Sequence, residues 1–108
     1  RPGPGGMIKR GPGARNREEQ PMKPTIRKPT EAERKRAQSW PIWEKEVSEF
    51  PWEYDSVETC LILAGAATVT NEAGEQFSFG AGDWVVFPKG MTCTWRVTKP
   101  IRKHYSFS

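Results

Sequence analysis

The chain has 108 residues, of which 35% are hydrophobic and 28% charged, and its formal net charge is +4. A chain of this length forms one domain at most, and the low apolar content indicates that part of it lies outside a packed core. Two cysteines are too few for a disulfide framework, and no segment is typical of a signal peptide or a membrane span, so we expect a soluble protein of a reducing compartment that makes no membrane contact.

The front of the chain is predicted to be an extended basic arm over residues 1–29. Residues 1–39 hold eleven Lys or Arg against four Glu, a net charge of +7, whereas residues 40–108 have a net charge of −3. Residues 1–29 also contain five of the ten glycines, six of the ten prolines and no aromatic residue. Such a segment buries too little apolar area to offset an ordering cost of roughly 1–2 kcal/mol per residue.

A short polar helix is predicted within residues 30–39, covering about residues 31–39. Thr30 and Glu33 have the spacing of a capping box, and basic residues follow the acidic first turn, as the helix dipole favours. The only apolar side chains are Ala32 and Ala37, so we expect no stripe that faces a core. Trp40-Pro41 then ends the helix, because the residue before a proline disfavours helical backbone angles.

Residues 40–108 have the pattern of a small all-β barrel. From Ile42 onward, short runs of β-branched and aromatic residues are broken by Gly, Asn, Asp or Pro every eight to twelve positions. We expect a hairpin at Gly65 between ETCLILAG and AATVTN, a turn at NEAGE, and separate final strands in TCTWRVTKP and IRKHYSFS. No helix fits between these strands.

Two segments match the spacing of the paired motifs of the cupin superfamily. The first motif reads His-x-His, three or four residues, Glu, six residues, Gly, and the chain has at these positions Trp52, Tyr54, Glu58 and Gly65. The second reads Gly, five residues, Pro-x-Gly, two residues, His, three residues, Asn, and the matching positions are Gly82, Pro88, Gly90, Cys93 and Val97. The chain therefore resembles a cupin, with a jelly-roll-like β-barrel, that keeps the scaffold positions and lacks three of the four metal ligands.

The resemblance implies a degenerate cupin pocket with no metal, no cofactor and no catalytic residue; its members are Trp52, Tyr54, Glu58, Cys60, Cys93 and Trp95. Indole only donates hydrogen bonds, and a phenol with a pKa of about 10 is no ready ligand at neutral pH. A buried Glu58 is expected to be protonated or bonded to Tyr54 or to a backbone N–H. Strand alternation also places Cys60 beside Glu58, and with Cys93 these residues form an alternative zinc set.

The aromatic residues have two open interpretations. Trp52, Tyr54 and Trp95 either fill the former ligand cavity or stack on a small planar ligand. Trp40, Trp43 and Trp84 are too many to be buried together in so small a barrel, and we expect Trp40 and Trp43 to contribute to a partner surface.

The basic residues of the arm and helix are candidates for binding a partner or nucleic acid; they are Lys9, Arg10, Arg15, Arg17, Lys23, Arg27, Lys28, Arg34, Lys35 and Arg36. Phosphate contacts would make such binding fall with salt. Without interleaved aromatic residues or a base-reading fold, any contact with DNA or RNA is expected to be non-specific. The alternative is a solvated charged tail.

A finer resemblance concerns the run WPIWEKEVSEFPWEYDSVETC behind a basic arm, which resembles chloroplast members of the small plant cupins near the ureidoglycine aminohydrolase-like group. It implies a non-catalytic subunit of a large complex at the plastid nucleoid, associated with the plastid-encoded RNA polymerase. Two alternatives stay open. One is a metal-dependent cupin enzyme of the aminohydrolase or oxygenase type that uses Glu58, Cys93 and His104, and the other is a non-specific nucleic-acid-binding protein. Since no motif pairs His104 with a nucleophile, we expect a surface or interface histidine rather than a catalytic one.

Overall fold

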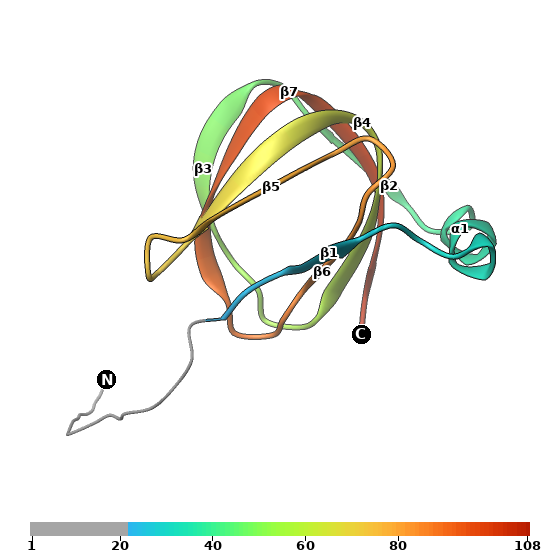
Figure 1. Cartoon of the computed structure of the whole chain (residues 1–108), viewed down its shortest axis with the longest axis horizontal. Helices are drawn as coiled ribbons and strands as arrows, with labels where there is room; N and C mark the ends of the chain where they lie inside the picture. Colours follow the sequence, from blue (N-terminus) through green and yellow to red (C-terminus); the bar gives the residue numbers. More distant parts are fainter. Residues whose placement is uncertain (1–21) are drawn as a thin grey trace.

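The structure is a computed structural model that describes residues 22–108 (Figure 1). Its elements are β1 (Thr25–Arg27), α1 (Glu31–Ala37), β2 (Ile42–Lys45), β3 (Ser48–Glu53), β4 (Glu58–Asn71), β5 (Gln76–Gly80), β6 (Trp84–Phe87) and β7 (Thr92–Phe107). The expected all-β fold with one short helix is confirmed. Four of the basic candidates, Lys9, Arg10, Arg15 and Arg17, lie outside the described residues.

Two long antiparallel strands, β4 and β7, form the middle of the barrel wall. The strand order is β1-β6-β4-β7-β2, and the other two strands are added where β3 pairs with β7 and β5 pairs with β4. Figure 1 shows the strands wrapping around one axis, with α1 outside the barrel. The first half of β4 pairs with β6 through Glu58–Leu61, whereas its second half pairs with β5 through residues 66–70.

Gly65 is a bend inside a strand, and the predicted hairpin at this residue is wrong. The chain runs on through it as β4, and the register against β7 shifts between Ile62 and Ala67. Gly65 has φ +85°, and a Cβ at this position would clash with the carbonyl group of Pro100 on β7. Glycine is needed because only its backbone can adopt this angle at such a close approach. The two predicted final strands are likewise one strand, β7, which continues through Pro100 at the same irregularity.

The sheet begins earlier in the chain than the sequence indicates. Residues 25–27, which we assigned to the extended arm, form β1 and pair antiparallel with β6. Pro24 and Pro29 flank this edge strand and leave its own N–H groups free to pair. The side chain of Ile26 packs on the barrel core, and Lys28 Nζ lies 2.9 Å from Asp83 Oδ1. Residues 25–28 therefore belong to the barrel, because Ile26 and Lys28 make contacts with distant strands that composition does not reveal.

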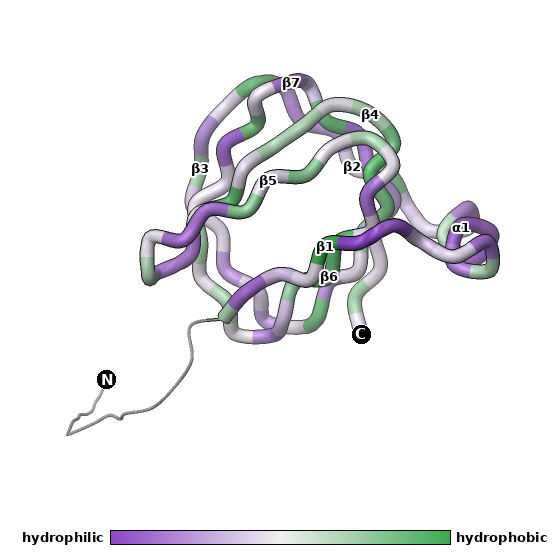
Figure 2. Tube along the Cα trace, viewed as in Figure 1, coloured by the Kyte–Doolittle hydropathy of each residue, from purple (hydrophilic) through white to green (hydrophobic). Residues whose placement is uncertain are grey.

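The helix α1 is confirmed, together with its capping box. Thr30 Oγ1 accepts from the backbone N–H of Glu33, and Glu33 Oε1 accepts from the backbone N–H of Thr30. Figure 2 shows α1 as mostly hydrophilic, yet Ala37 is fully buried against the outside of the barrel. It belongs to a group that we call the outer cluster, formed by Ala37, Trp40, Leu61, Trp84 and Val86. The helix therefore has one core-facing residue, which the sequence analysis did not expect.

The barrel interior is built by the alternation of side chains along the strands. On β7, Cys93, Trp95 and Val97 are buried while their neighbours are less so, and after Pro100 the alternation resumes with Ile101 and Lys103. Figure 2 shows hydrophobic and hydrophilic residues interspersed along the strands of the barrel. In residues 22–108, no helix has the length and apolar content needed to cross a membrane.

Candidate functional site

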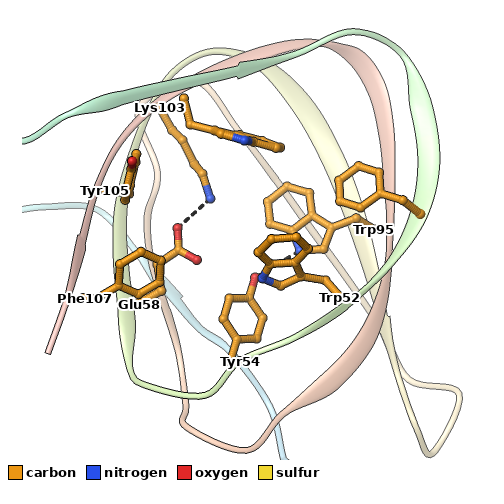
Figure 3. Close-up of a pocket in the computed structure, with 9 residues that line it drawn as sticks. Trp52, Tyr54, Glu58, Trp95, Lys103, Tyr105 and Phe107 are labelled. Atoms are coloured by element: carbon orange, nitrogen blue, oxygen red, sulfur yellow. Dashed lines mark hydrogen bonds and ion pairs between the residues drawn. The ribbon is translucent and has the colours of Figure 1, made fainter.

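One end of the barrel contains a pocket of about 180 Å³, lined mainly by aromatic side chains. Trp43 comes from β2, Phe50 and Trp52 from β3, Glu58 from β4, and the remaining residues from β7 or the segment after β3; these are Tyr54, Trp95, Lys103, Tyr105 and Phe107 (Figure 3). Four of the predicted pocket residues line this pocket. Tyr54, Glu58 and Trp95 lie inside it, and Trp52 lies at its rim.

A buried ion pair closes the inner end of the pocket. Lys103 Nζ donates to Glu58 Oε2 over 2.8 Å, and each side chain is only 5% exposed. The ammonium also lies 3.4 Å from Cys60 Sγ and sits over two indole rings, 4.8 Å from the centroid of Trp43 and 4.9 Å from that of Trp95. Both charges are therefore compensated at once, as burial of a charge requires.

The expected state of Glu58 needs correction. We predicted a protonated carboxyl group or a bond to Tyr54 or a backbone N–H, whereas the partner is the ammonium of Lys103. Lys103 was not among the predicted site residues, because lysine is almost never buried unless it is paired. A signal was present: Lys103 lies two residues after Ile101 and two before Tyr105, so it shares their face of β7.

Tyr54 and Trp95 fill the barrel beside this pair. Trp95 Nε1 donates to Tyr54 Oη over 3.0 Å, and the Tyr54 ring stacks on Phe87 with 4.7 Å between centroids. Burial, and then the nearby charge of Glu58, raises the pKa of Tyr54 well above its ordinary value. The phenol therefore stays neutral and acts as a hydrogen-bonding group. Trp52, in contrast, is 46% exposed at the pocket rim.

The two cysteines are buried but do not share a site. Cys60 Sγ donates to Glu58 Oε2 over 3.3 Å, which confirms the predicted placement of Cys60 beside Glu58. Cys93 lies opposite Trp52 on β3 and Asn71 at the far end of β4. Burial raises the pKa of the Cys60 thiol well above its ordinary value and that of Cys93 to about 11, so both are uncharged at neutral pH.

The alternative zinc set of Glu58, Cys60 and Cys93 is not assembled. Over residues 22–108, no three His, Cys, Asp or Glu side chains lie close enough together to hold a metal ion. The ammonium of Lys103 is already bonded to the one carboxylate that the first motif retains, and its charge would repel a cation at that place.

Comparison with known proteins agrees with this architecture. A family model of EutQ-like cupin domains matches residues 32–105, which is most of the chain. The chain belongs to this family. A comparison with curated proteins finds no significant match.

Three solved structures illustrate how far this cupin resembles other proteins. A DUF861-family protein from Thermotoga maritima is 50% identical, with 80% of this chain and 100% of that chain covered and a TM-score of 0.77. A putative ethanolamine utilization protein Q from Salmonella typhimurium is 27% identical, with 61% and 53% covered and a TM-score of 0.57. The EutQ protein of Clostridium difficile is 21% identical, with 61% and 52% covered and a TM-score of 0.57, and shares the fold.

His104 of this cupin points away from the pocket. It follows Lys103 on β7 and therefore faces the outside of the barrel, where Nδ1 donates to the carbonyl oxygen of Trp40 over 3.0 Å. Glu58, Cys93 and His104, which the enzyme alternative uses together, are thus placed on different faces or ends of the barrel. The expected surface histidine is partly buried beside the outer cluster.

The tryptophans are more buried in this cupin than the sequence analysis expected. Trp84 is 3% exposed and packs against Trp40 with 5.6 Å between ring centroids, and Trp43 lines the pocket. Trp40 and Trp43 are half-buried, Trp40 in the outer cluster and Trp43 against the barrel core, and a contribution of either ring to a partner surface stays a prediction. Within residues 22–108, the exposed large apolar side chains are Met22, Ile42, Val47, Trp52, Leu63 and Phe107.

Several basic candidates of this cupin are engaged within the chain. Lys23 pairs with Glu75, Arg27 with Glu33, and Lys28 with Asp83. The exposed cations on α1 are Arg34, Lys35 and Arg36, which follow one another in its last turn. Of the described basic candidates, these three are the ones whose charges have no ion-pair partner in residues 22–108.

Proposed function

We propose that this cupin is a non-catalytic interaction module, and that the ammonium of Lys103 stands in for the metal charge of a catalytic cupin. The observation that carries the proposal is the 2.8 Å bond between Lys103 Nζ and Glu58, the one residue of the ligand type that the motifs keep. Cupin metals are bound by imidazole and carboxylate groups, and the other ligand positions hold Trp52, Tyr54 and Cys93. This donor set offers one carboxylate and no imidazole to a metal ion.

The proposed setting is the plastid-encoded RNA polymerase at the chloroplast nucleoid, where the module would be an accessory subunit. This part rests on the resemblance of residues 40–60 to the chloroplast cupin called plastid transcriptionally active chromosome protein eighteen. Exposed apolar side chains support a role in docking, since Val47 is 59% and Phe107 53% exposed. Such residues in a small barrel are available for burial against a partner.

Co-purification tests this setting. The full chain carrying an affinity tag is recovered from fractionated chloroplasts, and polymerase subunits are expected in the same fraction at a constant ratio. Val47→Asp with Phe107→Asp should weaken this association, whereas Leu63→Asp, also at an exposed apolar residue, serves as the matched control. Migration of the tagged chain well apart from polymerase subunits would contradict the proposal.

Elemental analysis tests the non-catalytic role separately. The purified chain should contain no transition metal at a stoichiometric ratio, and Glu58→Ala should leave the metal content unchanged. An equimolar metal that disappears in Glu58→Ala would instead favour the enzyme alternative.

A second candidate function is non-specific nucleic-acid binding, favoured by the three adjacent exposed cations on α1. Arg34, Lys35 and Arg36 present positive charge on one turn, and the basic residues of 1–21 extend it along the sequence. Removing residues 1–21 keeps β1 and the outer cluster and should reduce salt-sensitive retention on DNA if this function is real. Unchanged retention in the shortened chain and in Arg34→Ala/Lys35→Ala/Arg36→Ala would exclude it.

A further inference from the structure

Two buried polar atoms at the pocket lack hydrogen-bond partners in residues 22–108. Glu58 Oε2 accepts from Lys103 and Cys60, but no donor reaches Oε1 of the same carboxylate. The hydroxyl of Tyr54 accepts from Trp95 Nε1, but its own O–H has no acceptor. Glu58 is 4% and Tyr54 2% exposed. Buried polar groups normally have partners, so a free acceptor and a free donor beside one pocket point to a molecule that binds both.

The size and walls of the pocket limit this molecule to one flat ring. Its volume of about 180 Å³ slightly exceeds the roughly 150 Å³ of an apolar cavity that accommodates benzene. Figure 3 shows the Glu58 carboxylate and the Lys103 ammonium pointing into the space between Tyr105 and Phe107 on one side and Trp52, Tyr54 and Trp95 on the other. Aromatic rings on both sides favour stacking or edge contacts with a planar ligand.

The charges at the inner end favour an uncharged ligand. Glu58 and Lys103 neutralise each other, so neither group offers a free charge that would attract an anion or a cation. The faces of Trp43 and Trp95 that could attract an organic cation are already covered by Lys103. A charged ligand would therefore lose its hydration without gaining a free counter-charge.

We propose that the pocket binds a small uncharged aromatic compound with a hydrogen-bond donor beside an acceptor, of which an aromatic carboxamide is the simplest form. The amide N–H would donate to Glu58 Oε1, and the amide carbonyl would accept from the Tyr54 hydroxyl. The ring would lie between Trp52 and Phe107, toward the pocket mouth. This inference goes beyond the proposed function and does not depend on the complex in which the barrel acts.

Binding of four related probes to the purified full chain tests the inference. Benzamide has the required ring and amide, benzoate adds a negative charge, benzamidine adds a positive charge, and cyclohexanecarboxamide keeps the amide but loses the flat ring. Nitrogen–proton spectra of the indole groups report binding directly, because Trp52 and Trp95 line the pocket. Benzamide is expected to shift these signals with a dissociation constant on the order of 1 mM, and the other three to bind about tenfold more weakly.

Matched tyrosine variants locate the binding. Tyr54→Phe removes the free donor and keeps the ring, so the affinity for benzamide should fall about fivefold to tenfold. Tyr105→Phe removes a hydroxyl from the opposite wall of the same pocket and should leave the affinity unchanged. Trp52→Ala, at the exposed rim, should weaken binding without requiring any change in the buried core.

Two results would overturn the inference. Indole signals that do not respond to benzamide would exclude the ligand class, and equal binding of all four probes would exclude the roles of charge and planarity. If Tyr54→Phe fails to fold, the four probes are compared on the original chain and on Trp52→Ala. This comparison still shows whether the pocket binds an uncharged aromatic amide. Because these measurements need only the purified chain, their failure is distinct from a failure of co-purification with the polymerase.

Discussion

A carboxylate meets a cation at nearly the same distance inside and outside the barrel wall. Lys103 Nζ and Glu58 are 2.8 Å apart in the pocket with both side chains 5% exposed, while Arg27 and Glu33 are 2.7 Å apart on the outer face with 45% and 17% exposure. The geometry of the two pairs is similar, but their surroundings are not. Distance alone therefore says little about what a pair contributes to the structure.

The two pairs differ in what happens when one partner is lost. Outside, water and salt replace a missing partner, so an exposed pair contributes little to the free energy of unfolding. Inside, the remaining charge has neither water nor a counter-charge, and breaking the pair costs about 3–5 kcal/mol. The stability of the barrel thus depends on the inner pair. The outer pair contributes less, because α1 is also held by its cap and by the packing of Ala37.

The largest effect is expected for Lys103→Met. This variant leaves the carboxylate of Glu58 buried and unpaired, and the free energy of unfolding should fall by about 3–5 kcal/mol in urea titrations. Adding Glu58→Leu removes the unpaired carboxylate, and the double variant should regain most of the lost stability. If Lys103→Met is as stable as the original chain, water must reach Glu58. The inner and outer ion pairs would then not differ in what they contribute to stability.

A smaller effect is expected at the helix cap. Thr30→Ala removes the acceptor for the backbone N–H of Glu33 and should lower the free energy of unfolding by about 1 kcal/mol. The comparable substitution Thr92→Ala, at an exposed position at the start of β7, is the control and should cost less. Equal losses in the two variants would mean that the cap does not stabilise α1.

The outer pair itself should matter less still. Arg27→Met breaks the bond to Glu33 but keeps an apolar chain near Trp84, over which the Arg27 guanidinium lies at 5.7 Å from the ring centroid. We expect a loss of stability smaller than that of Thr30→Ala, which shrinks further in high salt. Thermal unfolding at low and high ionic strength measures it, and a salt-independent loss above that size would show that the outer pair behaves like the inner one.

The last prediction concerns acid. The hydrogen bond from Arg27, followed by that from the backbone of Thr30, lowers the pKa of Glu33 from its ordinary value of 4.5 to about 2. Because the pKa is lower in the folded state, this carboxylate stabilises the fold above about pH 4.5, and the contribution is lost as the pH falls toward 2. Urea midpoints measured across this range should fall less steeply in Glu33→Gln than in the original chain; parallel curves would contradict the assignment.

The spacing of the motifs was sufficient to predict the barrel. Its glycines and prolines lie where the turns and strand ends of this fold require particular backbone angles. Gly82, Pro88 and Gly90 keep their places relative to Glu58, and the helix was predictable from Thr30 and Glu33 because a cap is a local interaction. The role of Gly65 was not predictable in the same way. A positive φ serves a turn or a bend equally well, and only the approach of Pro100, far along the chain, decides between them.

The candidate site was predictable as a depleted ligand set but not as an ion pair. Tyr54, Glu58 and Trp95 follow from the motifs and from strand alternation, whereas Lys103 lies outside both motifs, between Arg102 and His104 in a run that indicates a solvated edge. Its burial follows the alternation of Trp95, Val97 and Ile101 along β7, but only the pairing of β4 with β7 brings it to Glu58, 45 residues earlier in the chain. The burial of Trp84 likewise depends on a helix that lies about fifty residues earlier in the sequence.

The continuous pairing of β4 with β7 has a consequence for how the protein acquires its fold. The partners at the two ends of this ladder, Glu58 with Phe107 and Asn71 with Cys93, are separated by 49 and 22 residues of sequence. Such non-local pairing slows folding, because the intervening chain must lose entropy before its contacts form. Until β7 is available, one edge of β4 is unpaired, and an unpaired strand edge favours aggregation.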